Sequence, residues 1–388
     1  MSALPKPSPQ AQVLSQQLAN LIQQKIKDNN GWINFTSFMH MALYTPNLGY
    51  YSGGAKKFGM DGDFVTAPEI SPLFAKTLAL QVAQILAATQ GSGLISNILE
   101  LGAGTGKLAA DLLLELQQLD QLPKQYFILE VSDHLRQIQL ENLQEKLAQD
   151  LFKRVVWLEQ LPENFVGLIF GNEVLDALPV DLIHRTEQGL FERGVVFDRE
   201  FVWQDKPLKV GHLHDAASAL ALPNDYLTEI CLSATGLINS LANCLKQGVI
   251  LMLDYGFGAA EYYHPQRNTG TLMCHFQHFA HINPLINVGL QDITAHVDFT
   301  AIAEAGTAQG LSLAGYCNQA SFLMNCGILT ILAQVSPSDM ATYAPLAAAA
   351  QKLLSPAEMG ELFKVIAMTK NIDEQLIGFK SGDKSHTL

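Results

Sequence analysis

Three glycines at alternate positions follow an acidic residue, a spacing that could bind a nucleotide-like ligand. Residues 98–106 read Ile-Leu-Glu-Leu-Gly-Ala-Gly-Thr-Gly. Gly102, Gly104 and Gly106 permit a sharp turn and leave space where side chains would block a ligand. A dinucleotide fingerprint needs its last glycine three residues after the second, where this chain has Lys107. The spacing therefore predicts a nucleotide-like ligand other than a dinucleotide, or else a loop that only closes a strand-to-helix turn.

A second acidic residue lies where such a ligand would need it. The buried-type strand Tyr126-Phe-Ile-Leu ends in Glu130 and begins about 20 residues after the glycines. A carboxylate at this edge of a parallel sheet can accept hydrogen bonds from both hydroxyls of a ribose. The alternative is a solvated strand end.

Two carboxylates follow another predicted strand, residues 166–171. This strand leads into Asn172 and Glu173, and Asp176 comes three residues after Glu173. The two carboxylates would share a face if the loop forms a helical turn. Such a pair could hold a guanidinium through bidentate bonds or accept a proton from a nucleophile. The alternative is that both residues cap the turn that follows.

Two further stretches are weaker candidates for a site. Asp254-Tyr255 follows an apolar strand and is expected to face the same cleft, although a coincidental strand end is nearly as good an explanation. The second stretch has side chains that can bind a metal ion: Cys274, His275, His278 and His281. The usual paired spacing is missing, so histidines that line a substrate loop are favoured and no metal is expected.

The elements that must position these residues alternate between strand and helix. The pattern predicts an α/β, Rossmann-like sheet of seven strands with two insertions, about 181–246 and 255–292, the first containing a β-hairpin at 191–203. A helical N-terminal region covers 1–90, and the core covers 91–388. Helices are expected near 10–28, 35–43, 106–119, 134–149 and 299–306. Strands are expected near 95–101, 125–131, 154–158, 166–171, 248–254, 311–316 and 363–368.

Residues 44–72 are rich in turn-forming and aromatic residues. Long loops with this composition are commonly functional. We expect the segment to form a lid that becomes ordered when a ligand binds.

Composition limits the function further. The net charge of −13 argues against sequence-independent nucleic-acid binding, which needs a basic face. The five cysteines include no C-x-x-C pair and are expected to be reduced thiols in a cytoplasmic protein. No signal peptide is expected, no segment is expected to approach a membrane span, and the oligomeric state is not predicted.

The motifs resemble those of a broad class of enzymes and, more closely, those of one family within that class. The Glu100 to Gly106 stretch resembles the first motif of class I S-adenosylmethionine (SAM) methyltransferases. The whole set resembles the MidA-type methyltransferases, whose mitochondrial members are protein arginine methyltransferases that help to assemble respiratory complex I. The stretches that carry this second resemblance are 62–71, 100–106, 172–179, 254–256, 270–275 and 292–299.

This resemblance implies a class I SAM-methyltransferase fold with a helical N-terminal lid, SAM as the cofactor and a protein substrate. It assigns Glu173 and Asp176 to catalysis. The cofactor would contact Glu100, Gly102, Ala103, Gly104, Gly106, Glu130 and Asn172. The substrate or lid residues would be Asp63, Phe64, Thr66, Pro68, Glu69, Asp254, Tyr255 and His275.

The leading hypothesis is transfer of a methyl group from SAM to a protein arginine, which in the mitochondrial branch implies symmetric dimethylation. A methyltransferase for a small molecule or another nucleophile would share every cofactor residue. A third possibility is a SAM-binding assembly factor without turnover, which the intact glycines and Glu130 disfavour.

Overall fold

The chain folds into two compact units, each with its own hydrophobic core. The computed structural model describes residues 4–53, 66–91 and 93–388. The insertion unit contains the described parts of 1–64, 176–236 and 259–296, and the sheet unit contains those of 65–175, 237–258 and 297–388. Both predicted insertions thus contribute to the insertion unit together with the N-terminal helices, whereas residues 66–90 belong to the sheet unit.

The sheet unit is built on the predicted seven-stranded sheet, which is confirmed within the described residues. Its strand order is β15-β16-β10-β5-β2-β3-β4, and β14 pairs with the end of β10. The pairs β2–β3, β2–β5, β3–β4 and β5–β10 are parallel, whereas β16 runs antiparallel to its two neighbours. The strands are β2 (Asn97–Leu101), β3 (Tyr126–Leu129), β4 (Val155–Leu158), β5 (Phe165–Asn172), β10 (Leu245–Phe257), β14 (Val297–Asp298), β15 (Ser312–Asn318) and β16 (Phe363–Lys370).

Helices join these strands and supply most of the apolar contacts. In α5, Leu108, Leu112 and Leu116 recur every four residues and are buried, which fixes the face that packs on the sheet. The helices are α3 (Ala67–Ile70), α4 (Pro72–Gly91), α5 (Lys107–Gln118), α6 (Asp133–Lys146), α7 (Gln149–Phe152), α9 (Leu232–Cys244), α11 (Phe299–Ala308), α12 (Gln319–Asn325), α13 (Ile328–Leu332), α14 (Met340–Leu354), and the short 3-10 helices η1 (Ile377–Phe379) and η2 (Ser385–Thr387).

One helix corrects the sequence-based expectation about membrane spans. Pro72–Gln90 of α4 is long and apolar enough to cross a membrane, and 61% of it is buried within the structure. Phe74, Leu78 and Val82 belong to the core of the sheet unit, where α4 contacts α5 and β5. Burial on several sides explains why this helix is apolar.

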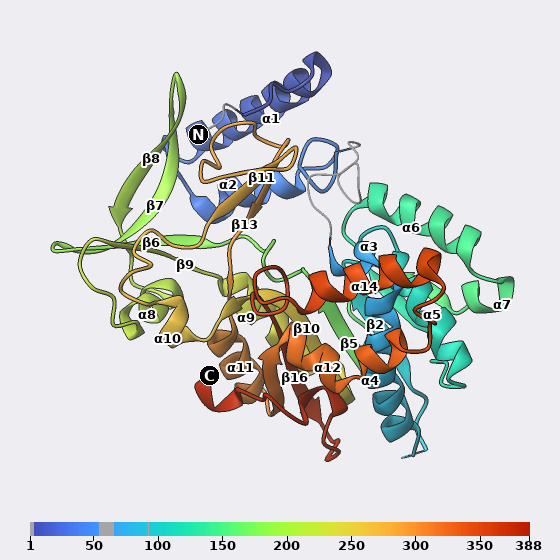
Figure 1. Cartoon of the computed structure of the whole chain (residues 1–388). Helices are drawn as coiled ribbons and strands as arrows, with labels where there is room; N and C mark the ends of the chain where they lie inside the picture. Colours follow the sequence, from blue (N-terminus) through green and yellow to red (C-terminus); the bar gives the residue numbers. More distant parts are fainter. Residues whose placement is uncertain (1–3, 54–65, 92) are drawn as a thin grey trace. The chain divides into compact units, whose positions relative to one another are not determined.

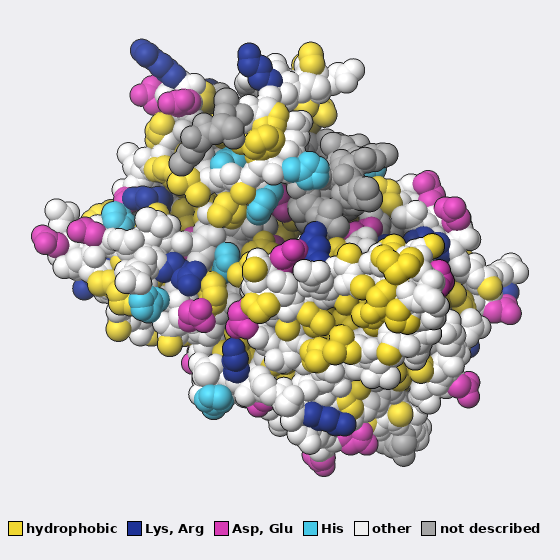
Figure 2. Space-filling model, in the orientation of Figure 1, with side chains coloured by type: hydrophobic (Ala, Val, Ile, Leu, Met, Phe, Trp, Pro, Cys, Tyr) yellow, Lys and Arg dark blue, Asp and Glu magenta, His cyan; other side chains and the backbone are white. Residues whose placement is uncertain are grey.

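Apolar side chains also reach the surface of the sheet unit. Figure 2 shows hydrophobic side chains gathered over the region that Figure 1 labels α12 and α14. Met324, Leu329 and Met340 are exposed in and beside these helices.

The insertion unit combines the N-terminal helices with two small sheets. One sheet has the order β1-β7-β6-β9 with β8 on β7, and the other has the order β12-β11-β13. Leu18, Phe38 and Ile293 come from distant parts of the sequence and meet in one core. The elements are α1 (Pro9–Asp28), β1 (Ile33–Asn34), α2 (Phe35–Tyr44), β6 (Asp181–Thr186), β7 (Gly189–Asp198), β8 (Glu200–Pro207), α8 (His212–Ala219), β9 (Tyr226–Ile230), α10 (Ala259–Tyr262), β11 (Met273–Phe276), β12 (Phe279–His281) and β13 (Asp292–Thr294).

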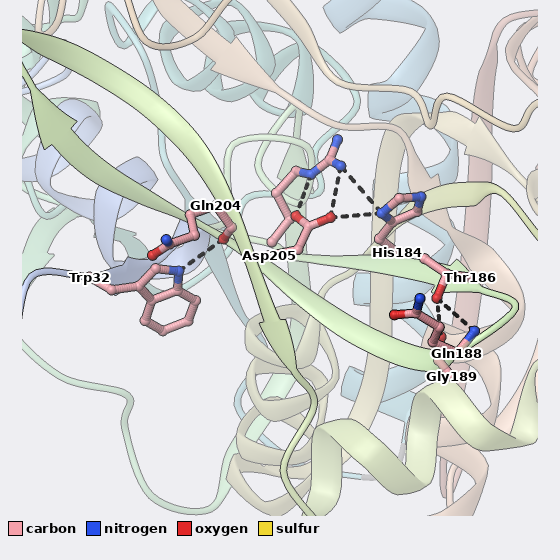
Figure 3. A network of polar contacts seen from close by, with 8 residues as sticks. Trp32, His184, Thr186, Gln188, Gly189, Gln204 and Asp205 are labelled. Carbon is pink, nitrogen blue, oxygen red and sulfur yellow. Dashed lines mark hydrogen bonds and ion pairs between the residues drawn. The ribbon is translucent and has the colours of Figure 1, made fainter.

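The predicted hairpin is β7–β8, and a polar network holds its base to β6 (Figure 3). Arg193 donates two hydrogen bonds to Asp205, with Nε–Oδ1 at 2.7 Å and Nη2–Oδ2 at 3.0 Å. His184 Nδ1 lies 2.7 Å from Asp205 Oδ2. Partial burial acts to raise the pKa of Asp205, but the hydrogen bonds from Arg193 and His184 outweigh it and lower this pKa. The network is therefore an ion-paired support of the hairpin.

A buried carboxylate joins the two insertions. Glu229, on β9, accepts hydrogen bonds from the backbone N–H groups of Thr271 (2.9 Å) and Leu272 (3.1 Å), and from the hydroxyls of Thr271 and Tyr262. A Cβ on Gly270 would lie 2.2 Å from Glu229 Oε1, so this position must be glycine. Glu229 is only 2% exposed. The 270–272 segment thus depends on one carboxylate.

We predict that Glu229→Gln destabilises the protein by about 1–3 kcal/mol, because an amide NH₂ would replace an acceptor that buried donors need. The free energy of unfolding measured in urea tests this. Glu200→Gln, an exposed change on the hairpin, is the control and should leave stability unchanged. Equal stability of Glu229→Gln and wild type would contradict the structural role of Glu229.

Candidate active site

The glycine turn joins β2 to α5 and leaves open space at its centre. Gly102, Gly104 and Gly106 have φ values of 60°, 53° and 80°, in the left-handed region that favours glycine. A Cβ on Gly104 would meet nothing within 4 Å, whereas one on Gly102 would lie 3.3 Å from Val174 Cγ2. Ala103 points the other way and is buried in the core of the sheet unit. The space in front of Gly104 can therefore receive a ligand.

Two amides on α6 hold this turn. Gln139 Nε2 donates to the carbonyl oxygen of Gly104 at 3.0 Å, and Asn142 Nδ2 donates to that of Thr105 at 2.8 Å. Gln139 is fully buried between Leu135 and Leu143 on one helix face. Neither amide was predicted from the sequence. A signal was present, because a glutamine interrupts an apolar stripe at i, i+4 and i+8.

The same glutamine orients the predicted ribose carboxylate, Glu130. Gln139 Nε2 donates to Glu130 Oε2 at 3.0 Å, and the Ser132 N–H donates to Oε1 at 3.0 Å. Trp157 Nε1 in turn donates to Gln139 Oε1 at 2.9 Å. Burial raises the pKa of Glu130, and the hydrogen bonds from Ser132 and Gln139 partly offset this. A carboxylate has about four acceptor positions, so Glu130 can still accept from a ligand hydroxyl.

Glu100 lies at the end of β2 and is only 2% exposed. The Tyr126 hydroxyl donates to Glu100 Oε2 at 2.8 Å. Burial raises the pKa of Glu100 from 4.5 to about 8; the Tyr126 hydrogen bond acts in the opposite direction, and the neighbouring Glu130 adds to the increase. Glu100 is thus a buried acid beside the turn.

Part of the predicted lid contacts the glycine turn. Thr105 Oγ1 donates to Glu69 Oε1 at 2.5 Å, so Glu69 lies at this turn within the sheet unit. Thr66 and Pro68 begin the short helix α3 that carries Glu69. Asp63 and Phe64 lie outside the described residues, as does much of the 44–72 segment.

The loop after β5 lies against the glycine turn through Val174. Asp254 is fully buried, and its Oδ2 accepts from the N–H groups of Val174 (3.1 Å) and Leu175 (2.8 Å). The Glu173 N–H donates to the Leu253 carbonyl oxygen at 2.9 Å. Asp254 therefore positions this loop.

Asn172 and Glu173 form a hydrogen-bonded pair at the start of this loop. Asn172 Nδ2 donates to Glu173 Oε1 at 3.1 Å, and the buried Asn172 Oδ1 has no hydrogen-bond partner among the described residues. Glu173 has φ of 54°, and residues 173–176 form no helix. The helical turn that would bring Glu173 and Asp176 to one face is therefore absent from this loop.

The other predicted site residues fall into different places. Tyr255 packs edge-on against Phe363 in the sheet unit, with ring centroids 5.5 Å apart. Asp176 belongs to the insertion unit, where its carbonyl oxygen accepts from Ala295 N at 3.1 Å. His275 pairs with Asp292 between β11 and β13 of the same unit.

Strand β11 directs Cys274 and His275 to opposite faces of its sheet. Cys274 is buried in the core of the insertion unit, and burial raises the pKa of its thiol. Its neighbour His275 points to the opposite face of β11, since side chains alternate along a strand. In the part of the chain that the structure describes, no group of three or more His, Cys, Asp or Glu residues is arranged to hold a metal ion.

Comparisons with known proteins agree with this geometry. The family model for S-adenosyl-L-methionine-dependent methyltransferases matches residues 77–317. The chain belongs to this family. The motif-based recognition of a SAM methyltransferase is thereby confirmed, and SAM is the cofactor of this methyltransferase.

Specific relatives extend the match over nearly the whole methyltransferase. A crystal structure of a protein from Burkholderia thailandensis with bound S-adenosyl-homocysteine is 47% identical with a TM-score of 0.95 and 100% coverage of both chains. The mitochondrial protein arginine methyltransferase NDUFAF7 of Danio rerio is 31% identical over 87% of this chain and 83% of its own length. The human protein of the same name is 30% identical over 89% and 82%. These matches confirm the class I methyltransferase fold.

The residues of the turn fit SAM. The open space at Gly104, the acceptor oxygens of Glu130 and the partnerless Asn172 Oδ1 supply room and hydrogen-bond acceptors in one region of the sheet unit. Glu69 adds a carboxylate at the turn, which suits a cationic ligand. Glu130, Asn172 and the glycines would hold the cofactor.

We predict that Gly104→Val abolishes SAM binding while the protein still folds. A valine there would fill the open space, and the left-handed backbone would cost about 1–2 kcal/mol of stability. Gly310→Val is a matched control, because Gly310 also has a left-handed φ of 79° and nothing within 4 Å of its Cβ. Calorimetry should show no heat of SAM binding for Gly104→Val and wild-type affinity for Gly310→Val. Unchanged affinity in Gly104→Val would place the cofactor elsewhere.

We also predict that the SAM-free protein loses stability as the pH rises from about 4.5 to about 8. In this window an unfolded chain releases the Glu100 proton, whereas the folded protein keeps it. Glu100→Gln has no proton to lose, so it should gain stability relative to wild type with rising pH. Urea unfolding at several pH values measures this, with the exposed change Glu145→Gln as the control. Parallel pH profiles for Glu100→Gln and wild type would be inconsistent with a buried protonated Glu100.

Proposed function

We propose that this methyltransferase is a protein arginine N-methyltransferase. The observation that carries the proposal is the loop after β5, which lies against the glycine turn through Val174 and has Glu173 as the residue before it, in the sheet unit. The NDUFAF7 relatives, which are described as protein arginine methyltransferases, support a guanidinium as the acceptor. A cytoplasmic location and a link to the assembly of respiratory complexes are further parts of this proposal.

In this proposal Glu173 orients the acceptor. A guanidinium is a planar cation with several N–H donors, and a carboxylate can accept two of them in parallel. Bound SAM supplies an electrophilic methyl group on a sulfonium. Glu173 holds one guanidinium nitrogen in the direction of attack, so that most of the catalysis is positioning. As the N–C bond forms, the S–C electron pair goes to sulfur and the nitrogen gives up a proton, which a carboxylate can accept.

Other residues fix Glu173 in place. Asn172 donates to its carboxylate, the Leu253 carbonyl oxygen accepts its N–H, and Asp254 holds the next two N–H groups. Because these partners hold the left-handed backbone of Glu173, its side chain has a defined direction.

We predict that Glu173→Gln lowers kcat/KM for methyl transfer about 10- to 100-fold, because the charge on which the guanidinium depends is removed. The affinity for SAM should stay near wild type. Labelled SAM and a cell lysate that lacks this protein provide the assay, and the labelled residue is identified after acid hydrolysis.

The exposed change Glu163→Gln serves as the control and should retain full activity. Full turnover by Glu173→Gln would refute this mechanism. Label in a small molecule instead of in protein would favour the alternative methyltransferase, and SAM binding without any transfer would favour an assembly factor.

A further inference from the structure

Two buried carboxylates of the insertion unit act on one tyrosine. The Tyr51 hydroxyl donates to Asp292 Oδ1 at 2.9 Å. Burial raises the pKa of Tyr51, and negative charge on Asp292 and Asp176 raises it further. Asp176 and Asp292 are only 5% and 2% exposed.

Strand β13 directs a third polar group to the same place. Ile293 packs in the core of the insertion unit, so its neighbours Asp292 and Thr294 point to the opposite face of the strand. Thr294 is 2% exposed, and its hydroxyl has no hydrogen-bond partner among the described residues. The N–H of the next residue, Ala295, donates to the Asp176 carbonyl oxygen, which keeps Asp176 beside this strand. This buried hydroxyl therefore has hydrogen-bonding capacity that a polar ligand can use.

Two stacked tyrosine rings, those of Tyr44 and Tyr51, lie beside these polar groups and are partly exposed. The rings of Tyr44 and Tyr51 stack with centroids 5.5 Å apart and an interplanar angle of 25°. The Tyr44 hydroxyl is held by the Ala177 carbonyl oxygen at 2.9 Å. Both tyrosines are half-buried, so their rings leave a route to solvent.

We propose that Tyr44, Tyr51, Asp176, Asp292 and Thr294 form a subsite for a guanidinium group. Two carboxylates supply the negative charge and the acceptors, the Thr294 oxygen accepts a further N–H, and the stacked rings match a planar cation. A lysine ammonium is a compact point charge that cannot form parallel bidentate bonds to a carboxylate or stack flat on a ring. The inference rests on the proposed function in one respect: in a protein arginine methyltransferase this subsite binds an arginine side chain of the substrate protein.

The structure changes the partner that the sequence suggested for Asp176. Glu173 and Asp176 are three residues apart in the chain but belong to different units. Asp292, which comes from the second insertion, acts with Asp176 on the same Tyr51 hydroxyl. The guanidinium subsite is thus assigned to Asp176 with Asp292, and Glu173 keeps its own role beside the glycine turn.

Small probes test the subsite in the full-length protein without knowledge of the substrate. Propylguanidinium, neutral propylurea of the same shape, and butylammonium are titrated by ligand-observed NMR. We expect propylguanidinium to bind at least about tenfold more tightly than the other two, because propylurea lacks the charge and butylammonium lacks the planar fork of donors. Equal binding of propylurea or butylammonium would overturn the assignment to a guanidinium.

Variants locate the binding. Thr294→Val keeps the side-chain shape and should weaken propylguanidinium binding about tenfold while it raises the melting temperature, because it removes a buried hydroxyl without a partner. Asp292→Asn should weaken binding at least as much. Asp181→Asn is the matched control, a buried carboxylate of the same unit that accepts from Thr36, and should bind like wild type. Wild-type binding by Thr294→Val would overturn the proposal even if Asp292→Asn fails to fold.

The lysate assay described above keeps the two proposals separate. If methylarginine forms but the Thr294 and Asp292 variants bind propylguanidinium like wild type, the subsite is rejected and the proposed function stands. Specific guanidinium binding without any methylarginine would do the reverse.

Discussion

The amide of Gln139 is the interaction on which the cofactor region depends. Its nitrogen donates both to the Gly104 carbonyl oxygen and to Glu130, and its oxygen accepts from Trp157. Glycines make the turn possible, but they also make it flexible, because they restrict the backbone least. A buried amide on a rigid helix compensates, since breaking either hydrogen bond would leave a buried group without its partner. The open space at Gly104 is therefore held open by α6 as well as by the absence of side chains.

Buried carboxylates have two distinct uses in this protein. Asp254 and Glu229 are surrounded by backbone N–H donors and act as structural anchors for loops. Asp292 instead accepts from the Tyr51 hydroxyl and from the backbone N–H of Ile293, and it shares a strand face with Thr294, whose hydroxyl has no hydrogen-bond partner among the described residues. A carboxylate that accepts from several backbone N–H groups holds a loop in place, whereas one beside hydroxyl groups can also contribute to the binding of a cation. This difference separates anchoring acids from candidate substrate-binding acids.

The insertions build a unit of their own. Glu229 from the first insertion and Thr271 from the second meet in hydrogen bonds, and Ile293 joins Leu18 and Phe38 in one core. Each insertion is too small to bury its own apolar face, so the two share a core with α1 and α2. In the sheet unit, β2 and β5 are parallel neighbours. The glycine turn follows β2 and the other loop follows β5, so the two lie side by side at one edge of the sheet.

The sequence by itself determined the seven strands, the helices α5, α6 and α11, the hairpin and the glycine turn, because these depend on local periodicity and on glycine spacing. It also placed Glu130 at a strand end correctly. It did not determine the partners of the buried polar groups. Gln139 meets Gly104 across 35 positions, Asp254 meets Leu175 across 79, and Tyr51 meets Asp292 across 241. Only the tertiary structure decided these pairs, because a buried donor or acceptor takes whichever partner the packing brings close, and no local pattern records that choice.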